Sequence, residues 1–315
     1  MDAQSIFIQS SDGLRLYARL YGDLASPLKP IVCLPGLTRN ADDFDTIAEI
    51  IVSKTKRPVV AFDYRGRGRS QFARDAAHYT IMVEAVDVRQ MLASLGIKRA
   101  IFLGTSRGGL ITMLLGVTAP ELIEAVILND IGPVLETEGL KRIASYVGNG
   151  AMPKTMEEAL QRIKDTNPDF TDLDESEWQR LTKMSFRETE EGYVALTYDA
   201  ALSRGFLAID FSKPQPTFWP LFEALKAVPV MVIRGETSDL LSEETVKEMI
   251  SRHPHCLSFT ALKEAHAPLL GRPKTAEAIV RFIRDLGNRG EVRSREARQN
   301  DPVNRFENRT RGAKA

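Results

Sequence analysis

A short stretch of the chain carries a serine in a setting where serine becomes reactive. Ser106 stands in Gly104-Thr105-Ser106-Arg107-Gly108, the pattern G-x-S-x-G, directly after the apolar run 100–103. In a turn from a strand to a helix, a nucleophile adopts strained dihedral angles, and glycines beside it avoid collisions. The amides of the following helix favour negative charge near the serine. The pattern therefore makes Ser106 a candidate nucleophile.

A serine of this kind needs a base, and the chain has four histidines. His266 follows the last predicted strand, which places it at the same edge of a parallel sheet as Ser106, and it is the predicted base. His253 and His255 flank a proline just past a helix, where exposed histidines are expected. His78 lies in a loop far upstream of the serine.

The elements that position these residues alternate along the chain. Short aliphatic or β-branched runs predict eight strands, at 5–10, 14–21, 31–34, 58–62, 100–103, 125–128, 228–233 and 256–261. Amphipathic patterns between most of them predict helices, at 42–53, 80–95, 106–117, 242–252 and 274–286. This alternation predicts an α/β protein with a mainly parallel sheet, helices on both faces and an antiparallel edge formed by the first two strands.

Two segments break the alternation. Residues 131–215 show only helical patterns, which is too long for a plain loop and predicts a helical lid over the carboxyl edge of the sheet. The expected organisation is a core at 1–132 and 216–287 with a lid at 133–215. Residues 288–315 hold eight Lys or Arg against four Asp or Glu and one aromatic side chain. They are expected to form a disordered charged tail.

Together these features resemble the α/β-hydrolase family over about residues 5–286. Residues 35–38, Pro-Gly-Leu-Thr, look like the family's oxyanion loop, and residues 63–70 resemble its turn after the fourth strand, which we interpret as structural. The resemblance implies the α/β-hydrolase fold, with a helical lid inserted after strand six. It also implies that the backbone N–H groups of Leu37 and Arg107 hold the oxyanion.

The resemblance leaves two candidates for the acid that orients His266. The family usually places this acid after strand seven, where Asp239 stands one residue beyond the usual position. Asp130 follows strand six, 24 residues after Ser106. An Asp-Ile-x-Pro run together with Gly-x-x-Ser resembles the esterases and amide hydrolases related to (acetamidomethylene)succinate hydrolase, which use the strand-six aspartate. Asp130 is therefore favoured, and Asp239 would instead cap a helix near Ser242 or bind the histidine from a second direction.

The expected function is hydrolysis of an ester or amide bond of a small-molecule acyl substrate through an acyl-enzyme, with no cofactor. No metal is expected either, because the histidines lack ligand spacing. Arg39 and Arg107 would suggest a substrate carboxylate if both faced the pocket, but the simpler interpretation leaves Arg39 in solvent and pairs Arg107 with a nearby acid. A carbon–carbon bond hydrolase and a non-catalytic ligand receptor on the same scaffold stay open as alternatives.

The balance of charges in the composition argues against nucleic acid and membranes as binding partners. The 42 basic and 42 acidic residues cancel, so no overall field attracts nucleic acid or an anionic membrane. No apolar run reaches the ~18 residues that span a bilayer, and the N-terminal residues show no signal-peptide pattern. Cys33 and Cys256 lie in apolar runs and are expected to be free thiols. A cytoplasmic location is the expectation, and the sequence does not indicate an oligomeric state.

Overall fold

The computed structural model describes residues 3–207 and 209–299, and its centre is an eight-stranded sheet. The strand order is β1-β2-β4-β3-β5-β6-β9-β10. Only the β1–β2 and β2–β4 pairs are antiparallel. The strands are β1 (Gln4–Gln9), β2 (Arg15–Tyr21), β3 (Ile31–Leu34), β4 (Val59–Asp63), β5 (Ala100–Thr105), β6 (Ile123–Asn129), β9 (Val230–Gly235) and β10 (Cys256–Ala261). The predicted fold class is confirmed.

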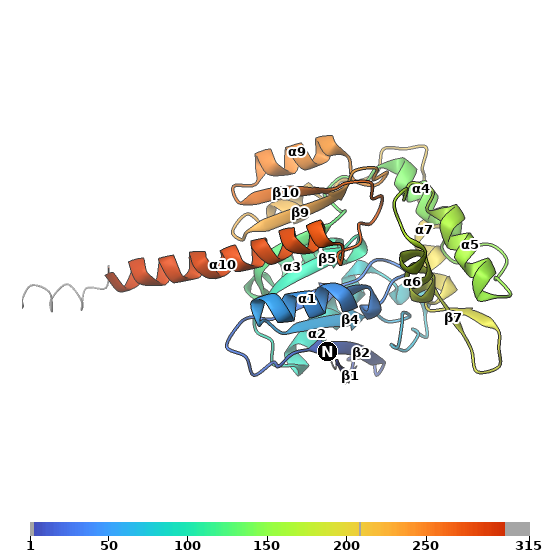
Figure 1. Ribbon diagram of the computed structural model, residues 1–315, viewed down its shortest axis with the longest axis horizontal. Coiled ribbons are helices and arrows are strands. Elements are labelled where there is room, and N and C mark those ends of the chain that lie inside the picture. Colours follow the sequence, from blue (N-terminus) through green and yellow to red (C-terminus); the bar gives the residue numbers. More distant parts are fainter. Residues whose placement is uncertain (1–2, 208, 300–315) are drawn as a thin grey trace, which may run out of the picture.

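Helices cover both faces of this sheet (Figure 1). One face carries α1 (Asp45–Thr55) and α10 (Pro273–Gln299), and the other carries α2 (Ile81–Ser94), α3 (Arg107–Thr118), α8 (Trp219–Glu223) and α9 (Glu243–Arg252). Along β5 the side chains of Ile101 and Leu103 enter the hydrophobic core under α1 and α10, and that of Phe102 enters the core under α2 and α3. Burial on both faces explains why the central strands are continuously apolar in sequence.

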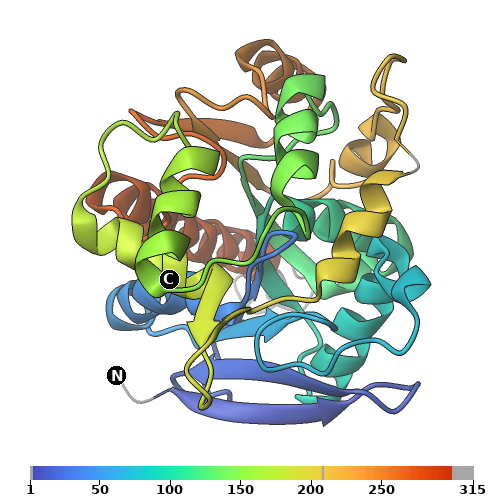
Figure 2. The same cartoon turned by 90° about the vertical axis from the view of Figure 1, so that its right-hand side faces the viewer.

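Between β6 and β9 the chain forms an insertion, residues 133–207 and 209–215, that gathers at one end of the sheet (Figures 1 and 2). Its elements are α4 (Thr137–Tyr146), α5 (Met156–Thr166), α6 (Glu175–Ser185), β7 (Phe186–Glu188), β8 (Val194–Leu196) and α7 (Arg204–Leu207). The antiparallel β7–β8 pair was not expected, because the sequence pattern predicts only helices there. Strands of three residues are too short to show alternation, and packing of Phe186 and Val194 against Ala159 stabilises them. Short 3-10 turns occur at Ala41–Phe44, Ala76–His78, Pro120–Leu122 and Ala200–Ser203.

The last helix, α10, continues past its predicted end at residue 286 to Gln299 (Figure 1). The described part of the expected tail is therefore helical, and residues 300–315 lie outside the described residues. No proline interrupts 274–299, and arginine, glutamate and alanine, which are good helix formers, are frequent there. Among the described residues, no helix has both the length and the apolar character needed to cross a membrane.

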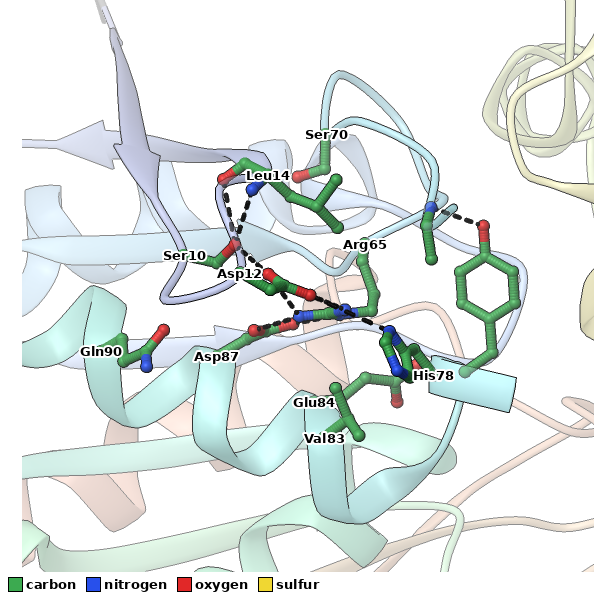
Figure 3. Close-up of polar contacts among 12 residues, drawn as sticks. Ser10, Asp12, Leu14, Arg65, Ser70, His78, Val83, Glu84, Asp87 and Gln90 are labelled. Atoms are coloured by element: carbon green, nitrogen blue, oxygen red, sulfur yellow. Dashed lines mark hydrogen bonds and ion pairs between the residues drawn. The ribbon is translucent and has the colours of Figure 1, made fainter. Parts of the chain in front are cut away.

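The turn after β4 is held by buried charges (Figure 3). The guanidinium of Arg65 donates to both carboxylate oxygens of Asp87, at 2.7 Å each, and to Asp12 in the β1–β2 hairpin at 2.8 Å. Asp63 accepts the backbone N–H of Arg69 at 2.7 Å, and burial raises the pKa of Asp63 to about 6. These contacts join the turn to the hairpin and to α2, which supports its interpretation as a structural feature.

Candidate active site

Ser106 lies at the tip of a tight turn between β5 and α3. Its backbone has φ 50° and ψ −114°, a region that L-residues rarely adopt. A Cβ atom added at Gly104 would lie 2.5 Å from the carbonyl carbon of Gly108, and one at Gly108 would lie 2.6 Å from that of Leu34. Both glycines of the pattern are therefore required sterically, because the start of α3 packs directly against the ends of β5 and β3.

A chain of hydrogen bonds runs from Ser106 through His266 to Asp130. The Nε2 atom of His266 lies 3.0 Å from Ser106 Oγ, and its Nδ1 atom lies 2.8 Å from Asp130 Oδ2. The Asp130 side chain is fully buried and His266 is nearly so. A carboxylate can only accept, so Nδ1 carries the proton and Nε2 is free to accept from the serine hydroxyl.

The Asp130 carboxylate is fixed by two further donors. Its Oδ1 accepts the N–H of Gly235 at 2.7 Å, and its Oδ2 accepts the hydroxyl of Ser238 at 2.5 Å. The Ser238 hydroxyl oxygen in turn accepts the N–H of Leu241 at 3.1 Å. Ser238 stands where the family usually has its acid, and sequence reasoning assigned it no role. The Gly-x-x-Ser spacing after β9 was the available signal.

Among the described residues, no hydrogen bond or ion pair joins Asp239 to His266. Asp239 instead pairs with Arg142 of α4, at 2.5 and 2.9 Å, and its carbonyl accepts the N–H of Gly139 at 3.1 Å. It does not cap α9 either, because Ser242 is the N-cap residue of that helix. Burial alone would raise the pKa of Asp239, but the Arg142 guanidinium outweighs it and lowers that pKa. The contacts make Asp239 an anchor for the insertion.

The two amides expected to hold an oxyanion lie beside the serine turn. Leu37 follows β3 in the loop over the serine, and Arg107 is the first residue of α3. Within residues 3–207 and 209–299, neither N–H group has a hydrogen-bond acceptor. Free amides at the start of a helix and in an adjacent loop can stabilise a negatively charged oxygen.

A buried network that the sequence analysis missed holds the residues carrying these amides. Glu84 of α2 accepts from Arg67 Nη1 at 2.7 Å and from Arg107 Nε at 2.6 Å. Arg67 Nε donates to the carbonyl oxygen of Leu37 at 2.8 Å. Glu84 and Arg67 are both fully buried. Arg107 therefore pairs with an acid, as the simpler interpretation expected, and the same carboxylate connects it through Arg67 to Leu37.

His253 differs from its sequence interpretation as an exposed histidine. Its side chain is buried, and its Nε2 atom lies 3.0 Å from the carbonyl oxygen of Leu225. Its Nδ1 atom accepts the N–H of His255 at 3.1 Å. Burial lowers the pKa of His253. The ring sits against Phe222, with 5.4 Å between ring centres, so apolar packing from α8 draws it into the core.

Ser106 and His266 line a cavity of about 350 Å³ between the core and the insertion. This volume is in the range of small-molecule sites. Apolar side chains of the insertion form much of its wall, namely Ile143, Tyr146, Phe170, Leu181, Met184 and Phe186. The wall also contains charged side chains, among them Arg39, whereas Arg107 is turned toward Glu84.

The chain belongs to the alpha/beta hydrolase fold family, which its residues 29–270 match. It is 33% identical over 290 residues to a 3-hydroxybutyrate-oligomer hydrolase of Cupriavidus necator, covering 88% of this chain and 96% of that protein. An alpha/beta hydrolase structure from Novosphingobium aromaticivorans is 40% identical, with a TM-score of 0.82 over 90% of this chain and 98% of the other. The structure of E-2-(acetamidomethylene)succinate hydrolase is 19% identical, with a TM-score of 0.73 over 90% and 99%, which is a likeness of fold. The protein is a hydrolase of this family.

Proposed function

We propose that this hydrolase cleaves ester bonds of small acyl substrates through an acyl-enzyme intermediate. The observation that carries the proposal is the hydrogen-bonded chain from Ser106 Oγ to His266 and on to the Asp130 carboxylate. In this proposal Ser106 is the nucleophile, His266 the general base and Asp130 the orienting acid. The N–H groups of Leu37 and Arg107 are the oxyanion donors.

The reaction follows from these placements. Ser106 Oγ attacks the acyl carbon while its proton passes to His266 Nε2, and the carbonyl oxygen becomes an oxyanion held by the two amides. The bond to the leaving alcohol then breaks, and the alcohol oxygen takes the proton from His266. Water attacks the acyl-enzyme and gives a proton to the same nitrogen. Breakdown of the second intermediate returns this proton to Ser106 and releases the carboxylic acid.

The insertion serves as a lid in this proposal, over a core formed by residues 1–132 and 216–287. The cavity between them supports this assignment, because insertion side chains and Ser106 share its wall. The paired Arg142 and Asp239 tie α4 to the loop that also carries Ser238. A lid tied in this way shapes the acyl site and limits the entry of bulk water.

The preferred substrates in this proposal are esters of short hydroxy acids. The relative named as a 3-hydroxybutyrate-oligomer hydrolase supports this substrate class, because such oligomers are chains of short ester units. The cavity volume of about 350 Å³ fits one or two units of that size better than a long acyl chain.

The test is hydrolysis of p-nitrophenyl esters of rising chain length, and of a linear 3-hydroxybutyrate dimer, by wild type and Ser106→Ala. We expect turnover of short esters and the dimer, lost by about a thousandfold or more in Ser106→Ala. Turnover that persists in Ser106→Ala would refute the assignment of the nucleophile. A folded wild type that cleaves no ester but cleaves an amide or a vinylogous diketone would refute the ester assignment and favour those bonds.

A further inference from the structure

The cavity wall is richer in positive than in negative side chains. Four arginines line it, Arg39, Arg162, Arg180 and Arg272, against the two carboxylates of Asp43 and Glu177. Glu177 is committed to Arg272, with contacts of 2.9 and 2.7 Å, and Asp43 receives Arg39 Nε at 2.9 and 3.0 Å. In the part of the chain that the structure describes, the other two arginines of this wall, Arg162 and Arg180, therefore have no carboxylate partner.

The two unmatched arginines differ in what their N–H groups do. Arg162 donates to the carbonyl oxygens of Ala151 and Asn149, so its fork closes a loop of the insertion. Arg180 donates Nη1 to the hydroxyl of Thr46 at 2.5 Å and Nη2 to the carbonyl oxygen of Asp43 at 3.3 Å. Among the described residues, its Nε has no acceptor. Within residues 3–207 and 209–299, Arg180 thus has no carboxylate to balance its charge, and its Nε–H group stays available as a donor at the cavity.

Arg39 and Arg180 both contact Asp43. Arg39 comes from the core loop and contacts the Asp43 carboxylate, whereas Arg180 comes from α6 of the insertion and contacts the Asp43 carbonyl. The Nη2 atom of Arg39 lies 2.9 Å from Met184 Sδ, and sulfur is a weak acceptor. The Asp43 carboxylate is therefore paired with Arg39, Arg180 reaches Asp43 only at its main chain, and a second anion would balance the charge of Arg180.

Both arginines share the cavity with Ser106, and Arg39 lies close to the serine turn. An added Cβ at Gly36 would lie 3.4 Å from Arg39 Cγ and 3.9 Å from Ser106 Cβ. The stem of Arg39 therefore lies near Ser106, and its guanidinium contacts Asp43 and Met184, which also line the cavity. A guanidinium presents parallel N–H groups that match a carboxylate, and the pairing strengthens where water is partly excluded.

We propose that Arg39 and Arg180 form a subsite for a carboxylate of the substrate. The enzyme then prefers esters that carry a free carboxylate a few bonds from the scissile group over neutral esters of the same shape. This inference rests on the proposed ester hydrolysis and adds its specificity. A substrate anion bridging the core and α6 would also hold the insertion over the cavity.

The experiment compares kcat/KM for matched esters within each variant. One pair places the carboxylate in the acyl group, p-nitrophenyl hemiglutarate against p-nitrophenyl pentanoate. The other places it in the alcohol, 3-(butyryloxy)butanoate against 2-pentyl butyrate. The quantity measured is the ratio within a pair, which cancels any general loss of activity or folding. Whichever pair shows the preference identifies the side of the scissile bond that carries the carboxylate.

We expect a wild-type ratio of about 10 to 100 in one pair, as for hydrogen bonds to a charged group. Arg180→Gln should reduce that ratio to about one, and Arg180→Lys should keep part of it. Arg39→Gln should reduce it further, because Asp43 would then repel the substrate. The control Arg281→Gln, an exposed arginine of α10 paired with Glu277, should leave the ratio unchanged. Ratios near one in wild type for both pairs, or a ratio that Arg180→Gln does not move, would overturn the proposal.

Binding tests the subsite independently of turnover. In Ser106→Ala, glutarate should raise Tm, whereas dimethyl glutarate and sodium chloride at equal ionic strength should not. Ser106→Ala combined with Arg180→Gln should lose this shift. A glutarate shift without ester turnover would retain the subsite and refute the ester assignment alone, whereas ester turnover without a glutarate shift or a ratio would refute the subsite alone.

Discussion

Replacing Asp130 by asparagine should stop the reaction while leaving the fold intact. Asparagine has nearly the same shape, but one carboxylate oxygen becomes an NH₂ group. The Oδ1 position faces the fixed N–H of Gly235, and Oδ2 faces His266 Nδ1 and the Ser238 hydroxyl. The Gly235 donor cannot turn, whereas the Ser238 hydroxyl can rotate, so the amide oxygen should occupy the Oδ1 position and the NH₂ group should face His266.

That orientation forces His266 into the wrong tautomer. Facing an NH₂ donor, Nδ1 must become the acceptor, and the ring proton moves to Nε2. Nε2 can then no longer accept the proton of Ser106. A change of this kind in a serine–histidine–aspartate triad lowers kcat by about ten-thousandfold. That factor corresponds to about 5.4 kcal/mol of lost transition-state stabilisation.

The assay is kcat on a short p-nitrophenyl ester, together with the rate of Ser106 labelling by a fluorophosphonate. Both rates should fall together in Asp130→Asn. The matched control is Asp239→Asn, which weakens the partly buried pair with Arg142. It should keep kcat within about threefold, because tautomer and nucleophile are untouched, and lower Tm by about 2–4 °C, as for a loss near 1 kcal/mol. If Asp239→Asn abolished labelling and Asp130→Asn kept it, the assignment of the acid would be refuted.

Three further predictions concern packing, the buried network and pH. Gly108→Ala should lower both Tm and kcat, because its new methyl group would meet the backbone of Leu34. The control Gly205→Ala, where nothing lies within 4 Å of the added methyl group, should change neither. A Tm of Gly108→Ala equal to that of wild type would refute the steric account. Glu84→Gln should lower the free energy of unfolding by about 3–5 kcal/mol, since it leaves buried guanidiniums without their carboxylate. It should also lower kcat with little change in KM. Urea denaturation measures the first effect and steady-state kinetics the second, and an unchanged stability would contradict the prediction. Burial lowers the pKa of His253 in the folded protein, so as pH falls below the usual histidine pKa of 6.5 the unfolded chain binds more protons than the folded protein and stability falls. His253→Gln should flatten the dependence of the free energy of unfolding on pH between about 5 and 7. An unchanged slope would refute this role of His253.

The sequence alone predicted the strand, turn and helix that position Ser106. Ser106 is recognisable because every requirement of its turn is local, namely an apolar strand before it, a helix after it and glycines two residues away on each side. His266 is predictable for a related reason, because the carboxyl ends of parallel strands share one edge of the sheet. Alternating periods of two and 3.6 residues likewise suffice for the eight strands and their helices.

Contacts between distant segments were beyond the sequence. Asp130 and Asp239 follow β6 and β9, which are neighbours in the sheet, so both reach the same edge and local pattern cannot choose between them. The choice depends on Ser238 and Gly235 turning their donors onto Asp130, and on Arg142 of α4 drawing Asp239 away. These pairings join residues 97 to 108 positions apart.

The same reason limits the prediction of charges and cavities. The sequence shows an arginine directly after the serine, but only the packing of α2 against α3 gives Arg107 a buried partner in Glu84. The contacts of Arg39 and Arg180 with Asp43 likewise require α6 to pack against the core loop. The sequence by itself determined which local turns and elements form, because their causes lie within a few residues. Only the tertiary structure decided which charges meet, because burial and hydrogen-bond geometry depend on segments that the chain brings together from afar.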